Sequence, residues 1–218
     1  MSATLAGISL ADVLLLHAAP IEGHGLEDLG VEEIGVGKVA ATFGAAAALR
    51  RREGVRAVLL FGVAGAYPAR QREDAPPVGV GDLAVVTQDR FGDEGVETPD
   101  GFLDLGAMKL GDVGPFPADR RLAEAATAAL GCPAVRGLTV STCSGTDAAS
   151  ARALARGGSA DVETMEGAAV AYVCRQHELP LLQVRAVSNW TGDRDRGEWS
   201  LGAAVDAAQR AVRRLLQP

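Results

Sequence analysis

Short apolar runs alternate along this chain with longer segments of helical patterning, and this alternation limits the folds that the chain can adopt. The runs are too short for helices and contain few polar residues, so they predict strands that are buried on both faces of a sheet. The predicted strands are 13–18, 55–61, 82–87, 136–141 and 181–188, with an edge strand at 31–34. The predicted helices are 39–52, 118–130, 148–156, 163–177 and 198–216.

This order of elements predicts an α/β fold with a mostly parallel, mixed central sheet that is flanked by helices on both faces. The length of 218 residues suits one such domain and would be tight for two. Neither an internal repeat nor a long linker divides the sequence, so we expect a single domain over residues 1–218.

Charge, hydropathy and cysteine content exclude several classes of partner. The formal net charge of −7 argues against nucleic acid, because binding to phosphates needs a basic surface. No apolar run approaches the ~20 residues of a membrane span, and the start lacks a basic signal region, so we expect no membrane contact and a cytoplasmic location. Cys132, Cys143 and Cys174 are an odd number without metal-ligand spacing. We therefore expect no disulfide, no metal and no cofactor.

Small and polar residues follow the predicted strands, where ligands bind in sheets of this kind. These positions are Glu22, 62–66, 91–102, 142–146, Met165–Glu166 and Ser188–Asn189. Because several of them are small, backbone groups are left free to contact a ligand, and the pattern predicts a cleft at this edge.

Six motifs occur in an order that is typical of one family. They are GVGKVA (35–40), GVAGA (62–66), VGVGDLAVV (78–86), VRGLTVS (135–141), ETMEGAAVAYVC (163–174) and PLLQVRAVSN (180–189). With these motifs, nearly the whole chain resembles the nucleoside phosphorylase and nucleosidase superfamily. The resemblance implies a nucleoside phosphorylase-like three-layer sandwich that cleaves the N-glycosidic bond of a small-molecule nucleoside.

Four segments are most similar to the futalosine hydrolase branch of that superfamily. They are APIE (19–22), FGDEGVE (91–97), ETMEG (163–167) and SNWTGDRD (188–195). This resemblance implies that water cleaves futalosine into hypoxanthine and dehypoxanthinyl futalosine, a step of menaquinone biosynthesis.

Two carboxylates match family positions with roles in glycosidic cleavage. The resemblance makes Glu22 the catalytic residue that activates water, and Glu166 the acceptor for the ribose hydroxyls, with Met165 packing under the sugar. A carboxylate suits both tasks, because it accepts protons and strong hydrogen bonds. Adenine-releasing nucleosidases usually carry a further Glu where this chain has Thr164, which argues against that subfamily.

Asn189 is the residue that indicates which base is released. Relatives that release adenine carry Asp at the matching position, and a protonated Asp can donate a proton to N7. Asn cannot do so at neutral pH, but its oxygen can accept from N7–H while its NH₂ donates to O6. We therefore expect Asn189 to act in catalysis on a 6-oxopurine.

The GVAGA turn indicates which nucleophile is used. Val63, Ala64 and Gly65 match the family turn over the sugar, although Val63 replaces a hydroxyl residue of many relatives. No Arg lies in 18–23 or 62–66, so a phosphate dianion lacks its usual partners there and water is the expected nucleophile. Arg90 remains a side chain that could reach the site.

The loop 142–146 matches the family segment whose backbone binds the purine edge, which implies that Cys143, Ser144 and Thr146 bind substrate. The usual stacking aromatic is absent, since Gly145 stands at its place, and Trp190 or Phe91 are the candidates to replace it. We do not expect Cys143 to be a nucleophile, because no His follows it in a suitable context.

Three alternatives stay open from the sequence: a purine nucleoside phosphorylase, a methylthioadenosine/adenosylhomocysteine-type nucleosidase, and a nucleoside-binding module without activity. Relatives are dimers or larger, so the resemblance implies a homo-oligomer, with 103–116 as the candidate contact. Arg90, Arg194 and Arg196 are candidates for pairing with the carboxylated tail of the substrate.

Overall fold

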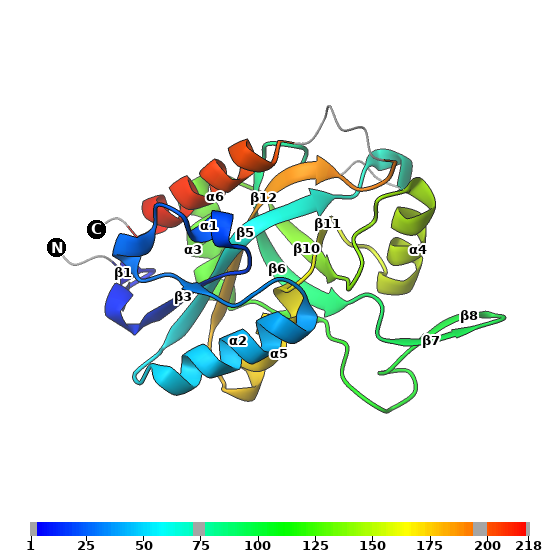
Figure 1. The fold of residues 1–218 in the computed structure, drawn as a ribbon, viewed down its shortest axis with the longest axis horizontal. Helices are drawn as coiled ribbons and strands as arrows, with labels where there is room; N and C mark the ends of the chain where they lie inside the picture. The colour runs from blue at the N-terminus through cyan, green and yellow to red at the C-terminus, as the bar shows by residue number, and fades with distance from the viewer. Residues whose placement is uncertain (1–3, 72–76, 194–199, 217–218) are drawn as a thin grey trace.

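A computed structural model describes residues 4–71, 77–193 and 200–216 of the chain (Figure 1). The described residues form an eight-stranded sheet in the order β11-β10-β6-β12-β5-β3-β4, with β9 paired to β6. The bounds are β3 (Val13–His17), β4 (Glu32–Glu33), β5 (Ala57–Ala66), β6 (Leu83–Phe91), β9 (Phe116–Pro117), β10 (Ala134–Thr139), β11 (Val162–Thr164) and β12 (Leu181–Trp190).

Helices cover both faces of this sheet. They are α1 (Pro20–Gly23), α2 (Lys38–Arg51), α3 (Arg120–Leu130), α4 (Asp147–Gly157), α5 (Gly167–Gln176) and α6 (Leu201–Leu215). Two small hairpins complete the fold, β1 (Thr4–Leu5) with β2 (Ile8–Ser9), and β7 (Gly95–Thr98) with β8 (Gly101–Asp104), together with 3-10 turns at Leu10–Asp12, Glu27–Leu29 and Ala69–Gln71.

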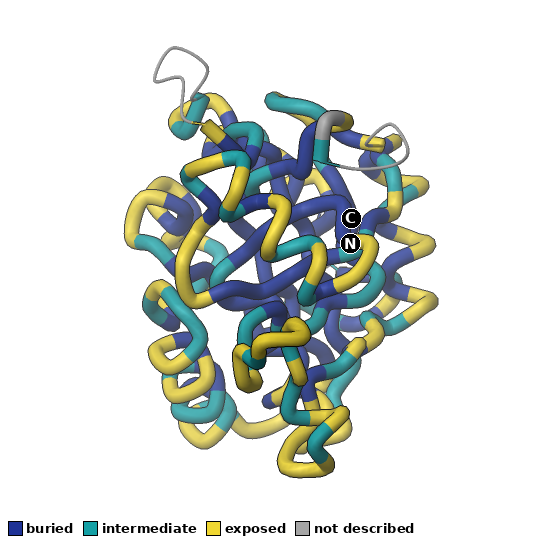
Figure 2. Tube along the Cα trace, turned by 90° about the vertical axis from the view of Figure 1, so that its right-hand side faces the viewer, coloured by how far each residue is buried: buried dark blue, intermediate teal, exposed yellow. Residues whose placement is uncertain are grey.

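Successive apolar residues of the central strands pack into different layers. In β3, Val13 and Leu15 contact the cluster that α3 and α6 contribute to, whereas Leu14 and Leu16 contact the cluster of α2 and α5. Since side chains alternate between the faces of a strand, an unbroken apolar run fits a strand with a helix layer on each side. Figure 2 shows the buried strands enclosed by helices that are exposed on their outer sides. The prediction of a mixed, mostly parallel sheet in a three-layer sandwich is confirmed.

The sheet curls because β11 pairs with two strands. It lies parallel to β10 and antiparallel to β5, where Glu163 is opposite Gly65. The strand β6 is likewise parallel to β10 but antiparallel to β12. This pairing brings the start of α5, the end of β5 and the end of β12 to one place.

Several predicted boundaries were wrong. β5 continues through 62–66 as a strand, although this segment was expected to be a turn, because it still finds partners in β12 and β11. The segment 91–102 leads from the end of β6 into the β7–β8 hairpin. Thr146 caps α4, since its Oγ1 accepts a hydrogen bond from Ala149 N at 3.2 Å.

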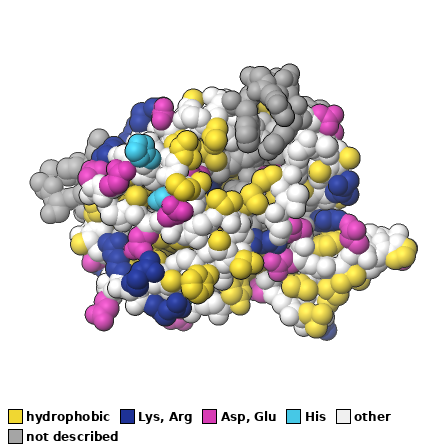
Figure 3. Space-filling model, viewed as in Figure 1, with side chains coloured by type: hydrophobic (Ala, Val, Ile, Leu, Met, Phe, Trp, Pro, Cys, Tyr) yellow, Lys and Arg dark blue, Asp and Glu magenta, His cyan; other side chains and the backbone are white. Residues whose placement is uncertain are grey.

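Large apolar side chains are exposed on one side of the molecule. On α2, Val39 is 86% and Phe43 is 71% exposed, and Leu110 in the loop after β8 is 75% exposed. Figure 3 shows hydrophobic side chains gathered over α2 and along the β7–β8 segment and the loop that follows it.

Candidate active site

Glu22 is held by backbone N–H groups from the turn after β3 and from β5. Pro20 starts α1 directly after β3, and one turn later the Glu22 side chain reaches back over that start. Its Oε2 accepts from Ala18 N at 3.0 Å and Ala19 N at 2.9 Å, and its Oε1 accepts from Val63 N at 2.9 Å. The residue is only 3% exposed. These donors fix the orientation of the carboxylate and leave a lone pair on Oε1 for a further partner.

Gly62 makes room for this arrangement. A Cβ at this position would collide with Oε1 of Glu22 and would lie 2.9 Å from Nη1 of Arg185. The absence of a side chain at Gly62 therefore lets a carboxylate and a guanidinium approach β5 from the same side.

Arg185 is a site residue that sequence reasoning missed. Its side chain is fully buried, and Nη1 lies 3.4 Å from Val63 O and 3.9 Å from Oε2 of Glu166. Within the described part of the chain, its Nε and Nη2 have no hydrogen-bond partner. Buried charges are normally paired or bind something, so a lone Arg inside the apolar strand 181–188 was the signal that could have revealed it.

Glu166 lies between the GVGKVA segment and Arg185. Its Oε1 accepts a hydrogen bond from Gly37 N at 3.0 Å, and the residue is 5% exposed. Burial raises the pKa of Glu166, while the charge of Arg185 opposes this rise and the charge of Glu22 adds to it. The charges of the two predicted carboxylates, Glu22 and Glu166, therefore interact. The structure brings both of them close to the guanidinium of Arg185.

A bulge in β12 places Asn189 beside Gly65. The pairing register shifts between Val187 and Asn189, so that Asn189, and not Ser188, lies opposite Gly65. Such bulges re-aim a side chain. The Asn189 Oδ1 accepts from Ser188 Oγ at 2.8 Å, and its Nδ2 donates to Trp190 O at 2.8 Å. This assigns the amide orientation and leaves one lone pair and one N–H free for a ligand.

The other residues that were predicted for the site differ in how far they are buried. Val63 and Gly65 are half-buried and Ala64 is buried within the last part of β5, and the half-buried Met165 directly follows β11. In the loop after β10, Ser144 is buried whereas Cys143 and Thr146 are exposed, and the Thr146 hydroxyl is engaged as the cap of α4. This loop lines a cavity of about 170 Å³.

Two basic residues of the site region are paired with acids. Arg90 Nη2 lies 2.9 Å from Asp104 Oδ2. Lys38 of the GVGKVA segment pairs with Asp93 at 2.5 Å and Glu94 at 3.0 Å. These pairs tie the start of α2 and the end of β6 together. Arg194 and Arg196 lie outside the described residues.

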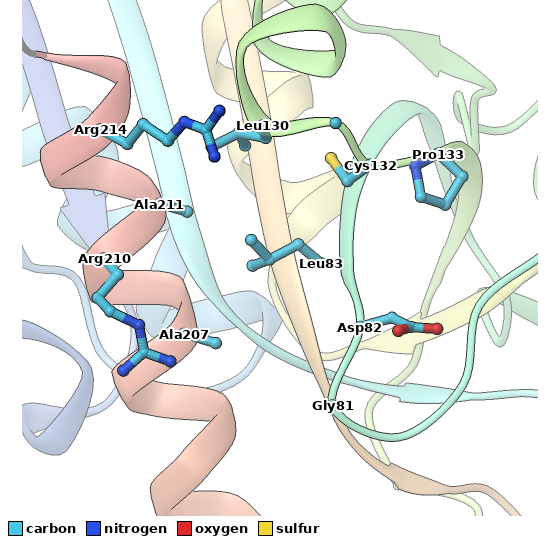
Figure 4. A pocket seen from close by; sticks show the side chains of 11 residues that line it. Gly81, Asp82, Leu83, Leu130, Cys132, Pro133, Ala207, Arg210, Ala211 and Arg214 are labelled. Atoms are coloured by element: carbon cyan, nitrogen blue, oxygen red, sulfur yellow. The ribbon is translucent and has the colours of Figure 1, made fainter.

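A cavity larger than the one at the loop after β10 has a different location. A groove of about 630 Å³ runs between α6, the turn after α3 and the start of β6 (Figure 4). Arg210 and Arg214 lie on one wall and Asp82 on another, and Leu83 forms part of the floor. None of the predicted site residues lines this groove, so size alone does not identify the active site. Among the described residues, no group of three His, Cys, Asp or Glu could hold a metal, and no helix is long and apolar enough to cross a membrane.

A buried polar network supports the start of α5 next to Glu166. Asp89 is 3% exposed, and it accepts hydrogen bonds from Thr139 Oγ1 at 2.9 Å and Gln183 Nε2 at 3.0 Å. The Thr139 oxygen also accepts from Ala168 N at 2.8 Å in the first turn of α5. The network therefore fixes the start of this helix relative to β6 and β12.

Asp89→Asn is expected to flatten the pH dependence of stability. Burial raises the pKa of Asp89 from 3.8 to about 6. A raised folded pKa means that the protonated acid contributes stability, which is fully present below about pH 4 and lost as the pH rises through about 6. Two pKa units correspond to about 3 kcal/mol. Between pH 4 and 7, the unfolding free energy from urea titrations should fall about 3 kcal/mol less in the variant. Equal pH profiles would contradict this role.

Comparisons with known proteins show the family of this chain. The family model of the phosphorylase superfamily matches residues 24–217, and the chain belongs to this superfamily. Its sequence is similar to two futalosine hydrolases in particular. It is 38% identical to that of Thermus thermophilus over 185 residues, which are 83% of this chain and 77% of the relative. It is 42% identical to that of Streptomyces coelicolor over 144 residues, which are 65% of this chain but only 60% of the relative's length.

Solved structures share the fold. A 5′-methylthioadenosine/S-adenosylhomocysteine nucleosidase from Colwellia psychrerythraea superposes with a TM-score of 0.77 at 22% identity, over 94% of this chain and 93% of that one. The native futalosine hydrolase of Helicobacter pylori gives a TM-score of 0.75 at 18% identity, over 93% and 96% of the two chains. At these identities the likeness supports the fold alone.

Proposed function

We propose that this chain is a nucleosidase that hydrolyses the N-glycosidic bond of futalosine and releases hypoxanthine, in menaquinone biosynthesis. The observation that carries the proposal is the buried cluster of Glu22, Arg185 and Glu166 beside Asn189, in a chain whose sequence relatives are futalosine hydrolases. Both the cluster and Asn189 lie along β5, so a nucleoside can place its ribose at the carboxylates and its base at the amide.

Glu22 accepts a proton from the attacking water in this proposal. The water oxygen forms a bond to C1′ of the ribose as the bond from C1′ to N9 breaks. The electron pair of the broken bond leaves with the purine. Glu166 accepts hydrogen bonds from the ribose hydroxyls. Arg185 Nη1 lies 3.9 Å from Glu166 Oε2, and among the described residues its Nε and Nη2 have no hydrogen-bond partner. Arg185 therefore orients the water and balances the charge of the cluster.

Asn189 stabilises the departing base. The departing purine takes a proton at N7 from solvent, since Asn cannot donate one at neutral pH. The remaining lone pair of Asn189 then accepts from N7–H, and its remaining N–H donates to O6 of hypoxanthine. Trp190 is half-buried, with its ring within 3.4 Å of a Cβ built at Gly79. Phe91 packs edge-on against Phe116. In this proposal the purine is recognised by polar pairing with Asn189, and not by stacking on Trp190 or Phe91.

Turnover of futalosine is expected not to require phosphate. A phosphate dianion at the nucleophile position would face two carboxylates, Glu22 and Glu166, for the one guanidinium of Arg185, whereas neutral water meets no such repulsion. The test measures hypoxanthine release from futalosine after enzymatic removal of phosphate and again with added phosphate, with inosine and methylthioadenosine run in parallel. Activity that disappears with phosphate removal would identify a phosphorylase instead.

We further propose a cytoplasmic homo-oligomer. The exposed apolar side chains of α2 and of the loop after β8 support an interface there, since large exposed apolar patches mark contact surfaces. Of the segment 103–116 that was predicted from sequence, Leu110 fits such a contact, whereas Phe116 is buried within the chain.

A further inference from the structure

Glu163 is a buried carboxylate for which the proposed reaction has no use. Three donors converge on it: Ser144 N at 2.7 Å from Oε1, Ser144 Oγ at 2.5 Å from Oε2, and Tyr67 Oη at 2.8 Å from Oε2. The residue is 5% exposed and Tyr67 is fully buried. Burial raises the pKa of Glu163, and its hydrogen bonds with Ser144 and Tyr67 oppose the rise. A buried acid with this many donors has a defined structural task.

Glu163 lies close to the residue that is proposed to bind the purine base. In the curled sheet, Gly65 of β5 lies opposite Glu163 on one side and opposite Asn189 on the other. The three residues therefore form one row across β11, β5 and β12. Because Gly65 has no side chain, nothing from β5 stands between the two flanking residues on that row.

Hydrogen bonds hold Ser144 from two sides. Its N–H and hydroxyl bind Glu163, and its carbonyl accepts from Gly192 N at 3.1 Å, just beyond the end of β12. The start of the same loop is tied by Ser141 N, which donates to Asp93 Oδ2 at 2.7 Å. Thr142, Cys143 and Ser144 line the cavity of about 170 Å³ at this loop.

We propose that Glu163 is a positioning residue that sets purine recognition by fixing the backbone of Ser144 relative to Asn189. It does not touch the substrate; it holds the loop that does. The identity of the ligand rests on the proposed function. Without the carboxylate, the Ser144 N–H and two hydroxyls would be buried without partners, so the loop would move to restore their hydrogen bonds. The cavity lining would then lose its fixed distance from the Asn189 amide.

The experiment compares Glu163→Ala, Glu163→Gln and Tyr67→Phe with the wild type, with hypoxanthine as the probe. Calorimetric titration gives its Kd, and hydrogen exchange of 141–146 reports the loop. Loss of a hydrogen bond to a buried charge should raise the Kd at least about tenfold in Glu163→Ala and speed exchange of this segment. Glu163→Gln should stay within about threefold, because its oxygen still accepts from Ser144 N and its NH₂ can donate to both hydroxyls. Tyr67→Phe should fall between them, since it removes one donor only.

Three outcomes would overturn the proposal. One is a Glu163→Ala protein with lowered Tm but unchanged hypoxanthine Kd and exchange. Another is a Glu163→Gln protein that loses as much affinity as Glu163→Ala while Ser144 stays protected, because the charge itself would then matter. The third is unchanged exchange of 141–146 in every variant. Failure of the proposed function is separate: wild type would then bind hypoxanthine poorly or not release it from futalosine, while the exchange comparison would still test the loop.

Discussion

Glu22→Gln is expected to lower kcat for futalosine by about 10²- to 10⁴-fold, the range that removal of a general base produces. The substitution keeps the size of the side chain and removes its ability to take a proton. In the structure the carboxylate is only 3% exposed and accepts from Ala18 N, Ala19 N and Val63 N. A surface carboxylate that merely favours a helix start would not be enclosed in this way. KM should change little, because in the proposed function the substrate hydroxyls bind Glu166 and not Glu22.

The hydrogen bonds of Glu22 add a second consequence of the same change. The NH₂ group of Gln would face at least one backbone N–H, since both carboxylate oxygens already accept from such groups. Such a mismatch costs about 1–3 kcal/mol of stability, so Tm and the active fraction must be measured beside kcat. Glu33→Gln is the matched control, because Glu33 is exposed on the short strand β4 nearby. A Glu22→Gln protein with a kcat like that of the control would remove Glu22 from the catalytic group.

Asn189→Asp is expected to narrow or reverse the preference of the enzyme for a 6-oxopurine. In the wild type, Ser188 Oγ and Trp190 O fix which end of the amide accepts and which donates. A 6-amino base would present its own hydrogens to Nδ2, and two buried donors would then face each other. Sites built on such pairing discriminate by several orders of magnitude. The wild type should therefore cleave futalosine far faster than aminodeoxyfutalosine.

The surroundings of Asn189 also indicate how an Asp side chain would behave there. The new oxygen would lie against the carbonyl of Trp190, where an ionised carboxylate is repelled and a protonated acid can donate. In its protonated form the introduced acid can also protonate N7, and its carboxylate can then accept from a 6-amino group. On futalosine, the same carboxylate would face O6 and lower the rate.

The measurement is the ratio of kcat/KM for the two substrates in both proteins. Ser188→Ala serves as a second variant, because it removes the hydroxyl that fixes the amide oxygen while it keeps Asn189. It should weaken the discrimination without reversing it. An unchanged ratio in Asn189→Asp, or a wild type that prefers the 6-amino substrate, would refute the assignment.

The sequence by itself determined the layers of this protein. Short, mostly apolar runs such as 13–18 and 181–188 predict strands covered on both faces, because most of their side chains need apolar neighbours. The rules for connections between parallel strands then leave few possible orders for these strands in the sheet. Glu22, Glu166 and Asn189 were candidates from the sequence as well, because they match motif positions of the family that the sequence resembles and lie near the ends of predicted strands.

Only the tertiary structure decided how these residues meet. The bulge that turns Asn189 toward Gly65 and the double pairing of β11 depend on contacts between strands far apart in the chain. The sequence marks Arg185 as a basic residue within an apolar strand, but its partner Glu166 lies on another element, so only the structure shows what it pairs with. Glu163 was treated as the start of a motif, yet its donors come from residues 19 and 96 positions away. Local patterning reports which side chains must be buried, whereas the partners of a buried charge are set by the packing of the whole chain.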